Sequence, residues 1–141
     1  MAPEKITVAA TISATADMVW RAYTTPADIM QWNAASEDWH TTAARVDLRV
    51  GGTFCSRMEA KDGSMGFDFE GTYTSVVPNE RLAYAFGERT AEVDFIPQED
   101  GVHVRVSFEA ETEYSLEQQR DGWQSILDSF GRHVEAKTAG A

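Results

Sequence analysis

The residues best suited to acid–base or metal chemistry are few and scattered. The chain has three histidines. His40 follows Glu37 and Asp38, so a metal or acid–base site could be drawn there. Neighbours in sequence rarely converge on one ion, however, and a solvated loop is the alternative. Strand alternation places His103 in water, and His133 lies near the end of the last predicted helix, where the helix dipole favours a cation.

The single cysteine, Cys55, lies between Phe54 and Ser56 on a predicted strand. A redox role would require a nearby cation to lower its pKa, and Arg57 is on the same face; a passive thiol is the alternative. One cysteine cannot close an internal disulfide, which fits a reducing cytosol. The chain has no zinc-binding cysteine set, nucleophile elbow, phosphate loop or metalloprotease motif, so we expect no metal and no cofactor.

A one-sided pattern of aromatic residues is the stronger signal. Between residues 43 and 111 polar and apolar side chains alternate, and glycine, proline and asparagine turns interrupt the pattern. Rings gather on one face and charged side chains on the other, as in an antiparallel sheet covered on one side. The rings could simply fill a core, or they could line a small-molecule cavity.

On the hypothesis that the rings line a cavity, we expect Trp32 at the mouth of the cavity. Tyr73, Tyr84 and Ser56 would then supply hydrogen bonds that orient the ligand. The full predicted lining consists of twelve residues: Trp32, Phe54, Ser56, Met58, Phe67, Phe69, Tyr73, Tyr84, Phe86, Phe95, Trp123 and Leu127.

The elements that must position these residues follow from periodicity and turn signals. The pattern predicts a first strand over 5–12 and six further strands over about 43–50, 52–60, 66–77, 80–86, 89–97 and 102–112. Two short helices follow the first strand and end near Trp32, with Thr25 as a cap and Asp28 placed for a capping box. A long helix begins after the capping box of Ser115 and Gln118 and runs to about residue 136.

These elements predict an α+β fold in which a curved seven-stranded antiparallel sheet wraps around the long C-terminal helix. A strongly curved sheet touches a helix along only part of its concave face. We therefore expect an apolar hollow between the sheet and the helix.

Composition limits the classes of function. The chain has 141 residues and a formal net charge of −11, with 43% hydrophobic and 25% charged residues. An acidic chain repels phosphate backbones, so we expect no nucleic-acid partner. No apolar run is long enough to cross a bilayer and the start does not read as a secretory signal, so we expect a cytoplasmic protein without membrane insertion. The length fits a single domain over 1–141, with a core at about 5–136.

Four short motifs, in order, resemble one family. They are Val19 to Pro26 followed by Trp32, Asp47 to Gly52, Gly71 to Tyr73 with Val77 to Leu82, and Asp121 to Trp123 followed by Leu127. Together they resemble the domains named for the activator of Hsp90 ATPase, within the Bet v 1-like, START-related superfamily. The chain departs from that pattern at Val102, where the family often has threonine, and at Asn33, near which many members have proline.

The resemblance implies a helix-grip fold with a hydrophobic cavity but no single activity, because the superfamily includes lipid carriers, polyketide cyclases and hormone receptors. We expect a module that binds a small apolar or amphipathic molecule. The alternatives are a cyclase- or hydrolase-type enzyme that uses the same cavity and a co-chaperone whose partner is an Hsp90-type chaperone. The enzyme would need an ionisable side chain pointing inward, whereas strand alternation directs most charged groups outward.

Overall fold

The computed structural model describes residues 4–34 and 36–139, the last two of them by their backbone alone. The remaining residues of the expected domain 1–141 lie outside the described part. Seven strands and three helices follow one another along the chain: β1 (Lys5–Ile12), α1 (Ala16–Thr24), α2 (Pro26–Trp32), β2 (Trp39–Val46), β3 (Thr53–Ala60), β4 (Gly66–Val77), β5 (Arg81–Phe86), β6 (Arg89–Gln98), β7 (Gly101–Glu109) and α3 (Leu116–Ala139).

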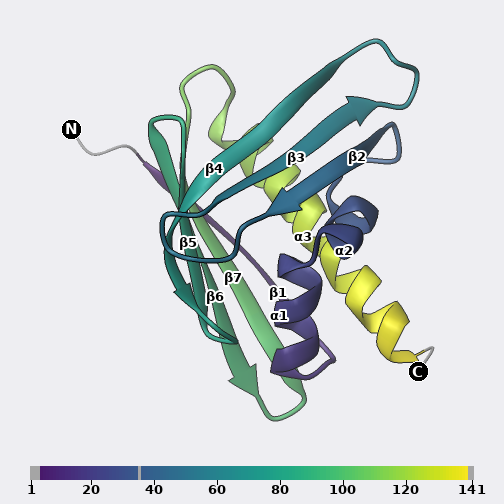
Figure 1. Ribbon diagram of the computed structural model, residues 1–141, viewed down its shortest axis with the longest axis vertical. Helices are drawn as coiled ribbons and strands as arrows, with labels where there is room; N and C mark the ends of the chain where they lie inside the picture. The colour runs from purple at the N-terminus through teal and green to yellow at the C-terminus, as the bar shows by residue number, and fades with distance from the viewer. Residues whose placement is uncertain (1–3, 35, 140–141) are drawn as a thin grey trace.

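The strands form one antiparallel sheet in the order β1-β7-β6-β5-β4-β3-β2. The sheet curls into a half-barrel around α3, and the β3–β4 hairpin projects beyond the helices (Figure 1). The predicted α+β helix-grip fold, with two short helices after the first strand, is confirmed.

The helices begin where the sequence supplies caps. Thr15 Oγ1 accepts a hydrogen bond from the Met18 amide, and this bond caps α1. Ahead of α3, the Gln118 amide donates to Ser115 Oγ at 3.0 Å, and the Ser115 amide donates back to Gln118 Oε1 at 3.1 Å. The reciprocal pair is the predicted capping box, and it satisfies two amides that a helix start leaves free.

The second strand differs from its predicted bounds. The prediction was 43–50, whereas β2 spans Trp39–Val46. A register irregularity between Thr41 and Ala43 interrupts the alternation that would have revealed the strand's beginning. Residues 47–52 instead form a tight turn, in which Gly51 has a φ of +85° and Arg49 pairs with Asp47 at 2.9 Å.

The capping box predicted for Asp28 is also wrong. Thr25 makes no side-chain cap, and Asp28 is buried at 8% exposure. Its Oδ1 accepts from His133 Nε2 at 2.8 Å and from Lys137 Nζ at 2.7 Å, both on α3. The carboxylate therefore ties α2 to the last two turns of α3 instead of closing its own helix.

The tightest packing lies between α3, α1 and one end of the sheet. Trp123 on α3 stacks on Phe108 of β7 with the ring centroids 4.0 Å apart. Trp20 and Tyr23 of α1 both meet Phe95 edge to face. Among the strands, the backbone of the long helix packs mainly on β1, and in the described part of the chain it does not pack closely on β3 or β4. The part of the concave face formed by β3 and β4 is therefore not covered by close packing of α3.

Candidate ligand cavity

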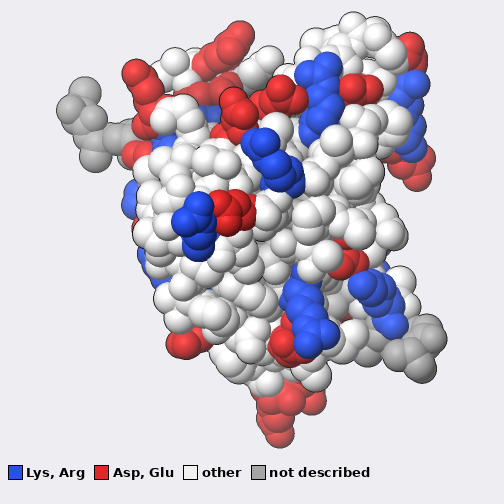
Figure 2. Space-filling model, viewed as in Figure 1, with Lys and Arg blue, Asp and Glu red and all other residues white. Residues whose placement is uncertain are grey.

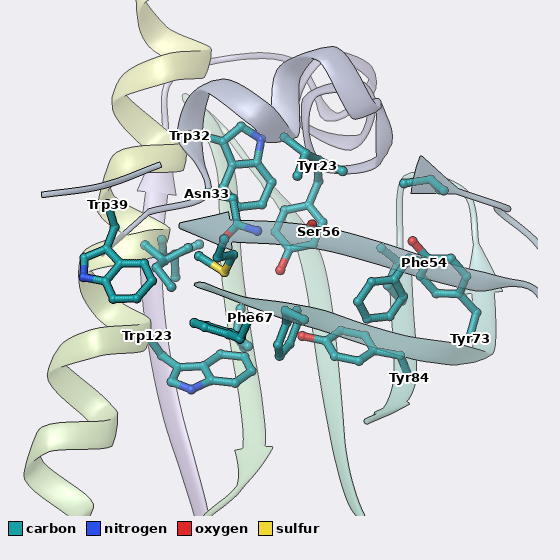
Figure 3. Close-up of a pocket in the computed structure, with 18 of the residues that line it drawn as sticks. Tyr23, Trp32, Asn33, Trp39, Phe54, Ser56, Phe67, Tyr73, Tyr84 and Trp123 are labelled. Atoms are coloured by element: carbon teal, nitrogen blue, oxygen red, sulfur yellow. The ribbon is translucent and has the colours of Figure 1, made fainter. Parts of the chain in front are cut away.

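A cavity of about 420 Å³ lies between the concave face of the sheet and α3, beneath α1 and α2 (Figure 3). Its walls combine side chains from both short helices, six strands (β2 to β7) and the long helix. The lining residues are Tyr23, Ile29, Trp32, Asn33, Trp39, Val46, Phe54, Ser56, Met58, Phe67, Phe69, Tyr73, Leu82, Tyr84, Arg89, Val106, Trp123, Ile126 and Leu127.

Ten of the twelve residues predicted from the sequence come together around this cavity. They are Trp32, Phe54, Ser56, Met58, Phe67, Phe69, Tyr73, Tyr84, Trp123 and Leu127. Period-two alternation explains the grouping on β3, because Phe54, Ser56 and Met58 point to the same side and each is at most 8% exposed. Whether these residues bind a ligand remains a prediction.

Phe86 and Phe95 are not among the lining residues. Phe86 packs behind the wall, with its ring 5.5 Å from Phe69 and 5.9 Å from Trp123. Phe95 is 2% exposed and contacts the rings of α1, so it belongs to the packed end of the interior. Both point inward as predicted, but inward residues at this end of the sheet meet α1 and α3 instead of open space.

Trp32 lies in the cavity wall and not at its mouth. It is 5% exposed, and its indole Nε1 donates to the Ala22 carbonyl at 2.9 Å. The predicted position was wrong because α2 turns the indole inward, where it meets Phe130 at 4.9 Å. Phe67 is the exposed lining ring, with 48% exposure, and its centroid lies 5.9 Å from that of Trp39.

Sequence reasoning missed the cation in the lining. Arg89 shares the inward face of β6 with Ala91 and Val93. Its position two residues before Ala91 was the available signal. The guanidinium lies 4.5 Å over the Phe86 ring, and its Nη1 donates to the Glu109 carbonyl at 3.1 Å.

The other lining residues that were not predicted from the sequence fall into two groups. Tyr23, Ile29, Asn33 and Trp39 belong to the short helices, to the residue that ends α2 and to the first residue of β2. Their part in the lining depends on how the helices pack across the sheet, which periodicity does not report. The others occupy positions that read as core in the sequence: Val46, Leu82, Val106 and Ile126.

The polar groups of the cavity are mostly hydroxyls. Burial raises the pKa of Tyr73 to about 12 and the pKa of Tyr84 well above its usual value. Burial likewise raises the pKa of Tyr23, and the charge that Tyr73 would acquire adds to the effect. The hydroxyls of Tyr23 and Tyr84 enter the cavity from opposite sides (Figure 3). All three phenols are therefore neutral hydrogen-bond donors at physiological pH.

The conventional catalytic residues lie elsewhere. His40 is on β2 and not in a loop, with its side chain exposed. The ring of His103 pairs with Thr11 Oγ1 at 3.0 Å, and His133 binds Asp28. Within the described residues, no group of three or more His, Cys, Asp and Glu side chains could hold a metal ion. None of the histidines lines the cavity.

Cys55 lacks the electrostatics of a reactive thiol. Burial raises its pKa, and the carboxylates of Asp68 and Glu70 raise it further, against the opposing effect of Arg45 and Arg57. A thiol with a raised pKa is a weak nucleophile at neutral pH, so the redox alternative loses its physical basis.

The surface charges are mixed on the face shown in Figure 2, where basic side chains lie among acidic ones. Arg81 pairs with Glu92 at 3.0 Å and with Asp94 at 2.9 Å, and Arg105 pairs with Asp94 at 3.3 Å. No helix in the described part of the chain is long and apolar enough to cross a membrane.

The fold and its curled sheet define a member of the Bet v 1-like superfamily, and comparison with known proteins identifies the family. The model of the activator of Hsp90 ATPase homolog 1-like protein family matches residues 13–135. The chain therefore belongs to this family, and the resemblance seen in the four motifs is confirmed.

Solved structures of similar proteins agree with this assignment to the family. The AHSA1-like protein from Aeromonas hydrophila is 48% identical, over 96% of this chain and 94% of that chain, with a TM-score of 0.91. Chr148 from Cytophaga hutchinsonii is 41% identical, over 97% of this chain and 96% of that chain, with a TM-score of 0.81. A protein from Chromobacterium violaceum is 26% identical over 94% of this chain and 99% of that chain, with a TM-score of 0.84. The search of curated proteins finds no match.

Proposed function

We propose that this protein binds a small apolar or amphipathic molecule in the cavity between the curled sheet and α3. The observation that carries the proposal is a space of about 420 Å³ between the sheet and α3, whose lining is dominated by aromatic and aliphatic side chains. Burial of a ligand's apolar surface supplies about 25 cal/mol per Å², and the few polar groups orient it.

The cavity supports binding better than catalysis. Among the described residues, the cavity lining includes no carboxylate and no histidine, and its ionisable groups are Arg89 and the tyrosines. Because burial raises the pKa of Tyr73 and Tyr84, neither phenol is a general base near neutral pH. A cyclase or hydrolase using this cavity would have to act without a carboxylate or imidazole of its own.

The co-chaperone alternative has a different basis. It depends on the family's name and not on a site seen in this chain, so we rank it second. A pull-down with Hsp90 and an ATPase assay separate it from ligand binding. Stimulated ATP hydrolysis would favour the co-chaperone.

A neutral polarity-sensitive dye, Prodan, tests the proposal. We expect saturable binding of one Prodan per chain, with a blue shift in its emission. Ser56→Leu fills the cavity from β3, because Ser56 is 5% exposed and faces the lining rings. The substitution should weaken Prodan binding at least about tenfold, because the added side chain takes the space that the dye needs.

Thr53→Leu is the matched control, because Thr53 is on the same strand but exposed on the opposite face. This variant should bind Prodan as the parent chain does. Binding that neither substitution alters, or a lack of any saturable signal, would reject the cavity as a binding site.

A further inference from the structure

Four hydroxyl groups line the cavity without a hydrogen-bond partner among the residues that the structure describes. They belong to Tyr23, Tyr73, Tyr84 and Ser56, and none of them hydrogen-bonds to another described residue, whereas Trp32 in the same wall does. Tyr73, Tyr84 and Ser56 are at least nine-tenths buried. A buried polar group without a partner costs free energy, so a cluster of such groups in an apolar wall needs an explanation.

The hydroxyls are open to the cavity. Among the described residues, the one fully buried side-chain oxygen without a partner is Glu111 Oε1. The unpaired hydroxyls are therefore not sealed in protein, and they retain surface that faces the hollow. Tyr23 and Tyr84 aim theirs into the cavity from α1 and β5 (Figure 3).

The protonation state of these hydroxyls determines which kind of ligand atom they can bind. Burial raises the pKa of Tyr73 to about 12, and the pKa values of Tyr23 and Tyr84 are raised as well. Each phenol therefore stays protonated and donates a hydrogen bond without supplying positive charge. Such donors suit a neutral acceptor oxygen, because a carboxylate moved into an apolar cavity needs a cation to offset its lost hydration.

Arg89 is the cation in the lining, but protein groups already engage it. Its Nη2 lies 3.7 Å from Glu111 Oε2, its Nη1 donates to the Glu109 carbonyl, and its guanidinium covers Phe86. An anion approaching Arg89 would also meet the Glu111 carboxylate, whose Oε1 is buried and unpaired. Arg89 is thus poorly placed to compensate a ligand carboxylate.

We propose that the cavity selects apolar molecules carrying a neutral acceptor oxygen, such as a ketone, over hydrocarbons and carboxylates of the same shape, and that the hydroxyls of Tyr23 and Tyr84 donate to that oxygen. This inference rests on the proposed function, because it specifies the chemical class of ligand for the same cavity.

Three probes that share one tricyclic framework test it: 9-fluorenone, fluorene and fluorene-9-carboxylate. Their dissociation constants are measured by displacement of Prodan, with the Prodan constant determined separately for each variant. In the parent chain we expect fluorenone to bind more tightly than fluorene-9-carboxylate. Tyr84→Phe and Tyr23→Phe should each weaken fluorenone about fivefold, the value of one neutral hydrogen bond, and leave fluorene within about twofold.

Tyr114→Phe is the matched control, because Tyr114 is 56% exposed and does not line the cavity; it should change no constant. Fluorenone binding that survives both cavity substitutions unchanged would overturn the inference and leave the proposed function intact. Preferred binding of fluorene-9-carboxylate, abolished by Arg89→Gln, would also overturn it. If none of the three probes binds, the proposed function fails and the inference with it.

Discussion

Phe95 and Phe67 both face the concave side of the sheet, but they have different surroundings. Phe95 is 2% exposed and sits between the rings of Trp20 and Tyr23, whereas Phe67 is 48% exposed at the cavity rim. Phe95→Ala should lower the free energy of unfolding by about 3–4 kcal/mol because it leaves a cavity in packed surroundings. Phe67→Ala should cost less than about 1 kcal/mol, because water already covers much of the ring.

Denaturant unfolding of the two variants measures this difference. The pair is matched, since both replace phenylalanine by alanine on the same face of one sheet. Equal losses of stability would contradict the assignment of Phe95 to the packed interior and of Phe67 to the rim.

The buried tyrosines give stability a dependence on alkaline pH. The pKa of Tyr73 is about 12 in the folded chain and near 10 in the unfolded one. The folded state thus holds the proton more tightly, and this contribution to stability is fully present below pH 10 and lost as the pH rises to about 12. Two pKa units correspond to about 3 kcal/mol.

Absorbance at 295 nm and denaturant unfolding between pH 8 and 11 test this linkage. Stability should fall above pH 10, and it should fall less in Tyr73→Phe, which has no phenol to ionise at that position. Ionisation of all the tyrosines at pH 10 in the folded chain would contradict their burial.

For single residues, the sequence predicted reliably which side chains face the inside of the sheet. It predicted less reliably which of these side chains line the cavity. Alternation located Phe54, Ser56 and Met58, and it could have located Arg89, whose charge argued against an inward position. It could not separate Phe95 from Phe69, because that distinction depends on where α1 packs on the sheet.

Among the helices, the link between α2 and α3 depends on one carboxylate. Burial disfavours the charge of Asp28, but hydrogen bonds from Lys137 and His133 outweigh that effect and lower its pKa. Asp28→Asn should reduce the free energy of unfolding by about 2 kcal/mol at pH 7, since it weakens a charged hydrogen bond and leaves His133 without its anion. Thermal or denaturant unfolding measures the loss.

The direction in which stability changes with pH follows from the lowered pKa of Asp28. The contribution of Asp28 is present above its unfolded pKa, near 4, and is lost as the pH falls through the lower folded value. The stability difference between the parent chain and Asp28→Asn should therefore shrink in acid. Lys137→Met is the control, and it should cost less than about 1 kcal/mol because Lys137 is 53% exposed. A constant difference from pH 7 to pH 3 would contradict the role given to Asp28.

The order and type of all ten elements were predictable, because each carries its own periodicity and turn or cap signals. The errors have local physical causes. An irregularity in register hid the start of β2. Asp28 forms a long-range hydrogen bond with His133 of α3 instead of capping its own helix. Long-range pairing of this kind leaves no mark in the local pattern.

For the whole molecule, the decisive property is the mismatch in shape between a curled sheet and one long helix. α3 packs mainly against β1, so its backbone does not pack closely on β3 and β4, and the cavity occupies the remaining space. The curvature argument predicted a hollow from the element order alone. The location of its exposed rim near Phe67 and Trp39 required the structure.

The most direct test of ligand binding is an NMR measurement of contacts between protein methyl groups and bound 9-fluorenone. The account predicts intermolecular nuclear Overhauser effects to the methyl groups of Met58 and Leu127, which are 8% and 3% exposed and line the cavity. Effects confined to the exposed methyl groups of Met65 and Val50, each 65% exposed, would mean that the probe binds the outer surface and would contradict the account.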